Sequence, residues 1–252
     1  MNKNFKEAFE KTKIAGSIAA GALDEVSKIV KPGISTNEID KTCYEYINDH
    51  KAYSAPLYYR GFPKSCCTSV NHVVCHGIPS EKILRDGDIM NVDVTALKEG
   101  WHGDTSRMFK IGEVSVKAEK LIQTTYEAMM KAIEVVKDGV LLGDIGSAIQ
   151  SHVESNGFSV VQDFCGHGIG QSFHQEPNVL HYGKKGTGEK IKSGMIFTVE
   201  PMINLGKFET KTLKDGWTAV TKDKTLSAQF EHTIGVTNEG YEIFTLSSDQ
   251  LD

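Results

Sequence analysis

The chain has 252 residues, of which 39% are hydrophobic and 24% are charged, and its formal net charge is -5. Such a composition is ordinary for a globular protein, and the acidic balance argues against a nucleic-acid-binding surface. No apolar run approaches the roughly 20 residues of a membrane span, and the polar N-terminus "MNKNFKEAFEKTK" lacks a signal-peptide core. The five cysteines are odd in number and show no CxxC spacing, so we expect a cytoplasmic protein without a disulfide framework or zinc ribbon.

The predicted elements follow the same order in the two halves of the chain. The first half is predicted to contain helices over 5–30 and 36–50, then strands over 66–76, 88–95 and 102–111. The second half is predicted to contain helices over 117–137 and 143–156, then strands over 158–164, 195–204, 217–221 and 227–237. Ser35 or Thr36 is a plausible N-cap of the second helix, and the later helices end near glycines.

A weak internal repeat supports this division. "IVKPGISTNEI" at 29–39 resembles "VVKDGVLLGDI" at 135–145 with an offset of 106 residues, and "LRDGDIMNVD" at 84–93 resembles "IKSGMIFTVE" at 191–200 with an offset of 107. We therefore predict an α+β protein with pseudo-twofold symmetry, in which the strands share a curved sheet and the helices cover one face. One domain would span 1–252, with halves of about 1–111 and 112–252.

The segment "NVDVTALKEGWHGDTSRMF", residues 91–109, reads as a β-hairpin with two aspartates on one face. A loop centred between Lys98 and Glu99 sets Asp93 directly opposite Asp104, whereas a loop at Glu99 and Gly100 leaves them one diagonal step apart. The repeat aligns Asp93 with Glu200. In "AQFEHTIGV", Glu231 then takes the place of Asp104, so four carboxylates are expected to converge.

Such a cluster needs neutralising. Four carboxylates at close range would destabilise the fold by several kcal/mol, on the order of the whole stability of a domain. Protonation would relieve part of this repulsion, and two divalent cations would neutralise it. "FCGHGIGQSFHQEP" at 164–177 offers His167 and His174, and the glycines beside His167 allow close backbone approach. The following residues lack the helical periodicity that a nucleotide-binding loop requires.

At this point the motifs resemble a known family. "VCHGIP", "GDIMNVDV", "GWHGDTSRMF", "CGHGIGQSFHQEP", "GMIFTVEPM" and "SAQFEHTI" occur in order between about residues 5 and 247. Together they resemble type I methionine aminopeptidases, metallopeptidases of the pita-bread fold. The resemblance implies an α+β structure in which a pseudo-twofold repeat of a helix pair plus strands surrounds a curved antiparallel sheet.

The resemblance also implies the metal centre. It implies two divalent ions per chain, Co, Mn, Fe or Zn, held by Asp93, Asp104, His167, Glu200 and Glu231. Asp104 and Glu231 would bridge the two ions, and a water shared between them would be the nucleophile. Glu200 would accept the proton of that water.

The substrate-binding residues are likewise implied by the resemblance. His76 would contact the departing amide nitrogen or the substrate backbone, and His174 would bind the peptide carbonyl and the oxyanion. The methionine pocket would be lined by Tyr59, Phe62, Cys67, Phe173 and Trp217. Pro56 departs from the cysteine that related bacterial enzymes often carry at the pocket rim. A monovalent-cation site is implied at Asn71, Val73 and Ser227.

The implied activity is removal of the N-terminal methionine from nascent polypeptides, encountered at the ribosome, when the next residue is small. We expect a monomer with no nucleic-acid or membrane partner. Two alternatives are a prolidase-like aminopeptidase of the same fold and a non-catalytic peptide-binding module. Cleavage of Met-Gly against Gly-Pro peptides separates the first alternative, and metal analysis separates the second.

Overall fold

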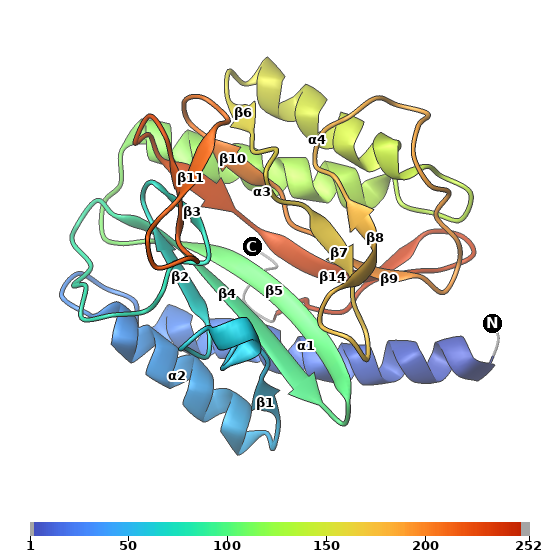
Figure 1. Cartoon of the computed structure of the whole chain (residues 1–252), viewed down its shortest axis with the longest axis horizontal. Helices are drawn as coiled ribbons and strands as arrows, with labels where there is room; N and C mark the ends of the chain where they lie inside the picture. The colour runs from blue at the N-terminus through green and yellow to red at the C-terminus, as the bar shows by residue number, and fades with distance from the viewer. Residues whose placement is uncertain (1–2, 248–252) are drawn as a thin grey trace.

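Two helix pairs frame the molecule (Figure 1). The computed structural model describes residues 3–247, so residues 1–2 and 248–252 of the expected domain lie outside it. The α-helices are α1 (Lys3–Ile29), α2 (Thr36–Asp49), α3 (Val116–Glu134) and α4 (Leu142–Ser155), and a short 3-10 helix η1 spans Tyr59–Gly61. These α-helices confirm the predicted ones. No helix in the described part of the chain is long and apolar enough to cross a membrane.

A curved nine-stranded antiparallel sheet carries both helix pairs on one face, and two small sheets adjoin it. Its order is β1-β4-β5-β14-β9-β7-β8, with β2 added to β4 and β15 added to β14. The strands of this sheet are β1 (Tyr53–Ser54), β2 (Cys67–Val70), β4 (Ile89–Lys98), β5 (Trp101–Lys110), β7 (Gly166–Gly168), β8 (Gln175–Val179), β9 (Ile196–Val199), β14 (Glu231–Val236) and β15 (Tyr241–Ile243). The small sheets are β13-β10-β6 and β11-β12-β3. Their strands are β3 (Val73–Cys75), β6 (Ser159–Val160), β10 (Met202–Asn204), β11 (Thr210–Thr212), β12 (Ala219–Thr221) and β13 (Ser227–Gln229).

The structure divides three of the predicted strands. The segments predicted as strands over 66–76, 195–204 and 227–237 each form two strands that belong to different sheets. The first breaks at Asn71, whose φ of 56° turns the chain, and the second breaks before Pro201, which has no backbone N–H to donate. The sequence also missed five short strands, β1, β7, β8, β11 and β15, because such short segments carry little periodicity.

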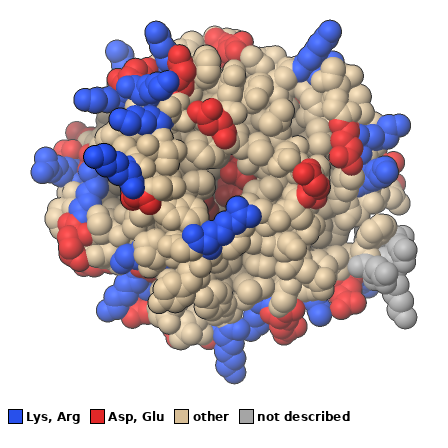
Figure 2. Space-filling model, in the orientation of Figure 1, with Lys and Arg blue, Asp and Glu red and all other residues tan. Residues whose placement is uncertain are grey.

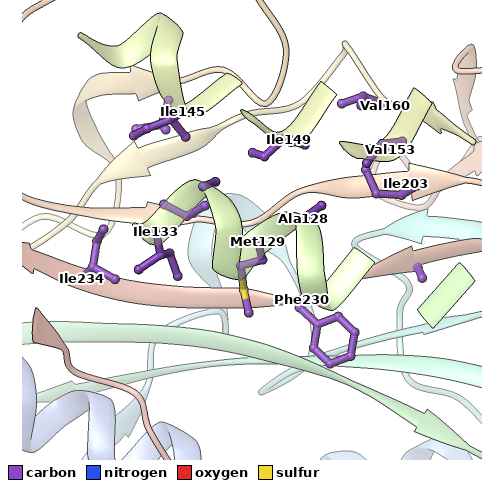
Figure 3. Packing of buried hydrophobic residues seen from close by; sticks show 14 of the residues in the cluster. Ala128, Met129, Ile133, Ile145, Ile149, Val153, Val160, Ile203, Phe230 and Ile234 are labelled. Atoms are coloured by element: carbon purple, nitrogen blue, oxygen red, sulfur yellow. The ribbon is translucent and has the colours of Figure 1, made fainter. Parts of the chain in front are cut away.

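Side-chain alternation along the strands separates a helix-packed face from a polar face. Val92, Val94 and Ala96 of β4 are fully buried in a cluster with α1 and α2, whereas Asp93 and Thr95 lie on the opposite face. The second half repeats this arrangement, with α3 and α4 packed on β9, β10 and β14 (Figure 3). The strands contribute Ile203 and Ile234 to this cluster. The helices contribute Ala128, Met129, Ile133, Ile145, Ile149 and Val153.

The internal repeat appears in the backbone hydrogen bonds. Gly33 N–H donates to Leu84 O at 2.8 Å, and Gly139 N–H donates to Ile191 O at 2.9 Å. Isolated bridges beside these bonds pair residues 35 with 83 and 141 with 190. These equivalent residues have the offsets of 106 and 107 seen in the sequence, which supports the pseudo-twofold relation.

Ser35, rather than Thr36, caps α2. Its hydroxyl accepts a hydrogen bond from Glu38 N–H, and the Glu38 carboxylate accepts one from Ser35 N–H, forming a capping box. At the equivalent place Leu141 N–H donates to the carboxylate of Asp144. The second helix pair therefore keeps the acidic half of the cap although its N-cap residue cannot contribute a hydroxyl.

Gly103 brings α1 against β5. A Cβ at this position would lie 2.2 Å from Gly16 N and 2.5 Å from Gly16 Cα. Because backbone atoms cannot rotate away, we expect Gly103→Ala to lower the free energy of unfolding by about 1–3 kcal/mol, measured by urea denaturation. Gly100→Ala is not a suitable control, because its φ of 81° adds strain. Gly240→Ala, which meets no atom within 4 Å, should change stability far less. Equal stability changes would contradict the close-packing explanation.

Candidate metal centre and substrate cavity

The hairpin loop sets the relation between the first two carboxylates. Lys98 pairs with Trp101, so the loop is Glu99-Gly100, with φ of 49° and 81°, as in the left-handed turns that suit hairpin twist. Asp93 consequently lies opposite Ser106, and Asp104 lies opposite Thr95. The directly opposed register was wrong, and the diagonal one is confirmed.

The neighbouring strands bring the other two carboxylates to the same face. Glu231 on β14 also lies opposite Ser106, so this small serine separates Asp93 from Glu231. The register of β14 against β9 places Glu200, just after β9, beside Glu231. All four carboxylates line one cavity of about 420 Å³, and Figure 2 shows acidic atoms at the bottom of a hollow near the centre of this face.

His167 comes from the short strand β7 and faces this cluster. Its Nε2 lies 3.7 Å from Asp104 Oδ2 and 3.6 Å from Glu200 Oε1. Its Nδ1 lies 3.0 Å from Gly168 O, and an Nδ1–H donated there leaves the lone pair of Nε2 toward the carboxylates. Glycines on either side allow this position: a Cβ at Gly166 would lie 2.4 Å from Thr198 O, and one at Gly168 2.2 Å from Glu176 O.

Burial and mutual repulsion perturb the acids. Burial raises the pKa of Asp93 to about 7 and that of Glu200 to about 8. Burial and the charges of the neighbouring carboxylates raise the pKa values of Asp104 and Glu231 well above their ordinary values. In contrast, burial lowers the pKa of His167 to about 4. At neutral pH this imidazole is therefore uncharged and able to act as a ligand.

The donor set fits a divalent metal ion. Ligand atoms of Asp104, His167 and Glu231 lie within 4.8 Å of one another, and all three side chains are buried. Glu231 Oε1 is buried and has no hydrogen-bond partner among the described residues. The separations from His167 to Asp104 and Glu200 exceed hydrogen-bond length but suit two ligands on one ion with bonds of about 2.0–2.2 Å. Carboxylates with imidazole suit Mn, Fe, Co or Zn.

A second layer of side chains, which the sequence reasoning missed, orients the acids. Thr95 Oγ1 donates to Asp104 Oδ1 at 2.7 Å, and Thr198 Oγ1 donates to Glu200 Oε1 at 2.7 Å. The two threonines stand two residues from Asp93 and Glu200, on the same face, so strand periodicity could have indicated them. Gln229 donates to Glu200 Oε2 at 3.3 Å, and His181 Nε2 accepts from Glu200 N–H at 3.2 Å.

Every residue predicted to bind substrate lines the same cavity as the carboxylates. These residues are Tyr59, Phe62, Cys67, His76, Phe173, His174 and Trp217. Phe62 and Trp217 meet edge to face at 5.2 Å, and Tyr59 and Phe173 lie 4.9 Å apart. Burial and the charge of Asp93 raise the pKa of the Cys67 thiol well above its usual value, so the thiol stays neutral. The seven residues predicted to bind substrate form a wall that is mostly aromatic and apolar, and its polar groups are neutral.

The two substrate-side histidines are held differently. His174 Nδ1 lies 3.0 Å from Tyr59 Oη, and burial together with His167, His76 and Arg60 lowers the pKa of His174 to about 3. His76 follows β3 with a φ of 56°, its ring set at right angles to Phe164 and Trp217. A non-glycine residue in this region is an outlier of the kind found at functional sites.

The cavity also includes residues that the sequence did not indicate. Besides Thr95, these are Arg60, Asp163, Phe164, Cys165 and Met202, and Pro56 lies in the wall as well. Cys165 and Cys67 are free thiols, as are Cys43, Cys66 and Cys75. The absence of disulfides among these five cysteines agrees with the sequence analysis.

The residues predicted to bind a monovalent cation lie outside this cavity. Ser227 N–H donates to Asn71 O at 2.9 Å, which brings two of them together. Val73 begins β3 two residues after Asn71 and pairs with Val220. This site therefore stays a prediction.

The raised pKa values give the metal-free protein a distinctive pH dependence. Because Asp93 and Glu200 hold protons more tightly when folded, the stability due to protonation is present below about pH 4 and is lost as pH rises through about 7 to 8. We expect the Tm of chelated protein to fall between pH 5 and pH 8. Metal return at pH 8 should raise Tm, since a ligand that binds only the folded state stabilises it. If the Tm changes neither on chelation nor on return of the metal, the clustered-carboxylate interpretation is contradicted.

This centre, four carboxylates and one imidazole inside a pseudo-symmetric α+β fold, defines a metal-dependent hydrolase. The chain matches the metallopeptidase family M24 over residues 10–238, and it belongs to that family.

The similar sequences are methionine aminopeptidases. The chain is 58% identical over 245 residues to the methionine aminopeptidase of Rickettsia prowazekii (strain Madrid E), covering 97% of this chain and 95% of that protein. It is 54% identical over 245 residues to the one of Escherichia coli (strain K12), covering 96% and 93%. These relatives confirm the resemblance found from the motifs.

Solved structures agree. The crystal structure of methionine aminopeptidase from Rickettsia prowazekii superposes with a TM-score of 0.95 at 57% identity, covering 96% of this chain and 98% of that one. The Thermotoga maritima enzyme gives 0.94 at 39% identity, covering 96% and 97%. A prolidase from Pyrococcus furiosus gives 0.77 at 21% identity and covers 96% of this chain but 65% of that chain, a likeness that shows the shared fold alone.

Proposed function

We propose that this protein removes the N-terminal methionine from nascent polypeptides whose next residue is small. The observation that carries the proposal is the single cavity in which the carboxylate and imidazole cluster adjoins an aromatic wall with two neutral histidines. The 54–58% identity to methionine aminopeptidases over nearly the whole chain supports the same activity.

We propose that two divalent ions would be held by Asp93, Asp104, His167, Glu200 and Glu231, whose side chains line the same cavity. Such ions would supply Lewis-acid polarisation of the scissile carbonyl and a water of lowered pKa. The neutral His167 presents Nε2, fixed by its Nδ1 contact with Gly168 O. Thr95 holds Oδ1 of Asp104 and leaves Oδ2, which faces His167, for coordination. Thr198 fixes Oε1 of Glu200, the oxygen that itself faces His167.

Three side chains would carry out the proton transfer and bind the reacting peptide bond. Glu200 would accept the proton of the attacking water, because its carboxylate lies in the cluster beside the proposed ions, whose charge would keep it ionised. When the Tyr59 hydroxyl donates to Nδ1 of His174, the proton of that neutral ring resides on Nε2. His174 can then donate to the scissile carbonyl oxygen as negative charge develops on it. His76, which lines the same cavity, would contact the departing amide nitrogen or the substrate backbone.

The methionine side chain would occupy the space between Tyr59, Phe62, Cys67, Phe173 and Trp217. Aromatic rings and a neutral thiol are favourable neighbours for a thioether. With Pro56 in the wall, the cavity has the thiols of Cys67 and Cys165 and lacks a third at the rim.

We further propose that residues 1–252 act as one catalytic domain and as a monomer. It would work in the cytoplasm on chains emerging from the ribosome. A monovalent cation at Asn71, Val73 and Ser227 would brace the turn beside β13, away from the reacting atoms.

A peptide panel tests the activity. Met-X peptides with X from glycine to leucine, and Gly-Pro and Ala-Pro peptides, are assayed with Mn, Fe, Co and Zn in turn. We expect free methionine only from peptides with small X. Cleavage of the proline peptides alone would indicate a prolidase-like enzyme, and bound metal without cleavage of any peptide would indicate a binding module.

A further inference from the structure

Arg60 is a cation at the cavity whose only role so far is a contribution to the lowered pKa of His174. It is exposed and lines the cavity that holds the carboxylates. Within residues 3–247 no Asp or Glu forms an ion pair with it. Figure 2 shows a basic side chain beside the central acidic hollow. An unpaired guanidinium at the entrance of a cavity is available to a ligand.

The backbone and a neighbouring ring fix the position of this cation. Arg60 has φ 46° and ψ 30°, and Tyr58, which precedes η1, has φ 66° and ψ 3°. Two non-glycine residues in the left-handed region of one short turn are unusual, and such outliers suggest a functional constraint. The guanidinium carbon of Arg60 lies 5.3 Å from the centroid of the Tyr59 ring, a cation–π contact.

Tyr59 links Arg60 to the reacting end of the cavity. The Tyr59 hydroxyl lies 3.0 Å from Nδ1 of His174. The Tyr59 ring centroid is 5.3 Å from the Arg60 guanidinium carbon and 5.2 Å from the His174 ring centroid, so the guanidinium lies at most roughly 11 Å from that imidazole. An extended peptide advances about 3.3 Å per residue. A substrate whose scissile carbonyl meets His174 would therefore bring a side chain two or three residues further on near Arg60.

We infer that Arg60 selects substrates with an acidic side chain at their third or fourth residue. The inference rests on the proposed function, because it concerns the same substrate in the same cavity. Asp163 also lines the cavity, but its carboxylate accepts a hydrogen bond from the Thr210 hydroxyl. Arg60 is therefore the less engaged of the two charges, and the preference is for acidic rather than basic chains.

The experiment compares peptides that differ only in the charge of one side chain. Met-Ala-Asp, Met-Ala-Asn and Met-Ala-Lys peptides with a common remainder, and a second series with the charge at the fourth residue, are assayed for kcat and KM. At low ionic strength the acidic peptide of at least one series should exceed its basic counterpart about three- to tenfold in kcat/KM. The difference should lie in KM, since Arg60 is remote from the reacting atoms, and should shrink at 0.5 M salt.

Substitutions of Arg60 test whether this preference depends on its charge. Arg60→Gln should bring the acidic-to-basic ratio to about one, Arg60→Glu should invert it, and Arg60→Lys should keep its direction. Arg85→Gln is the matched control, because Arg85 is exposed, lies outside the cavity and loses the same charge; it should keep the ratio of the parent.

Three results would overturn the inference: a parent ratio near one in both series, a preference for lysine, or a preference that survives in Arg60→Gln. Its failure is distinct from failure of the proposed function. If the uncharged Met-Ala-Asn peptide is cleaved but charge has no effect, only the selection by Arg60 is wrong. If no peptide releases methionine, the proposed function itself is wrong, and with it the inference.

Discussion

Asp104→Asn should abolish metal binding while making the metal-free protein more stable. Asparagine keeps the oxygen that accepts from Thr95 Oγ1 but removes the charge that Asp93 and Glu200 repel. Since even side chains that support ligands are worth about 10- to 100-fold in metal affinity or activity, losing the proposed bridging ligand should lower kcat by at least about 100-fold. Removing about 1 kcal/mol of repulsion would raise the Tm of chelated protein by roughly 2–4 °C.

The measurements are metal content after dialysis, kcat on a Met-Ala peptide, and thermal melts of chelated protein at pH 8. Asp49→Asn is the matched control, because Asp49 is exposed at the end of α2 and lies outside the cavity. It should behave as the parent does in all three. If metal content and kcat of Asp104→Asn both stay within about twofold of the parent, the ligand assignment fails. If the variant loses metal but its chelated form is less stable than the parent, the repulsion argument fails alone.

His174→Ala should lose kcat without losing metal. The proposed hydrogen bond of His174 strengthens as the carbonyl oxygen gains negative charge, so it contributes little to ground-state binding. Losing one such donor typically lowers kcat by roughly 10²–10³, with a much smaller change in KM. His174→Gln, which retains a donor, should recover part of the rate.

His167→Ala provides the contrast within the same segment. The Nε2 atom of His167 faces Asp104 and Glu200, so this variant should lose metal together with activity. Metal loss in His174→Ala with retention in His167→Ala would show that the two roles are exchanged. If neither variant loses activity, both histidines have only a structural role. Tyr59→Phe separates the orienting contact from the donor, because it removes the hydroxyl beside Nδ1 of His174 and should give a smaller fall in kcat.

Local sequence patterns were enough to predict the four carboxylates of the candidate centre. Strand alternation placed Asp93 with Asp104 on one face, and the repeat at offsets of 106 and 107 added Glu200 and Glu231. These inferences depended on local periodicity and on internal comparison, both of which a sequence records. The helices were predicted for the same reason, since amphipathic segments of this length carry a clear period. The cavity in which all of the proposed ligand and pocket residues meet agrees with that reasoning.

The arrangement of these groups could not be read from the sequence and follows from the folded chain. The hairpin register depended on whether Glu99 adopts a positive φ, which both loop choices left open. Predicted strands divided where the chain passes from one sheet to another, and alternation does not mark such a change of partner. His181 meets Glu200, and Gln229 meets it from 29 residues away. The cation of Arg60 comes to the cavity through a left-handed turn. These contacts join segments with no shared local pattern, so folding alone brings them together.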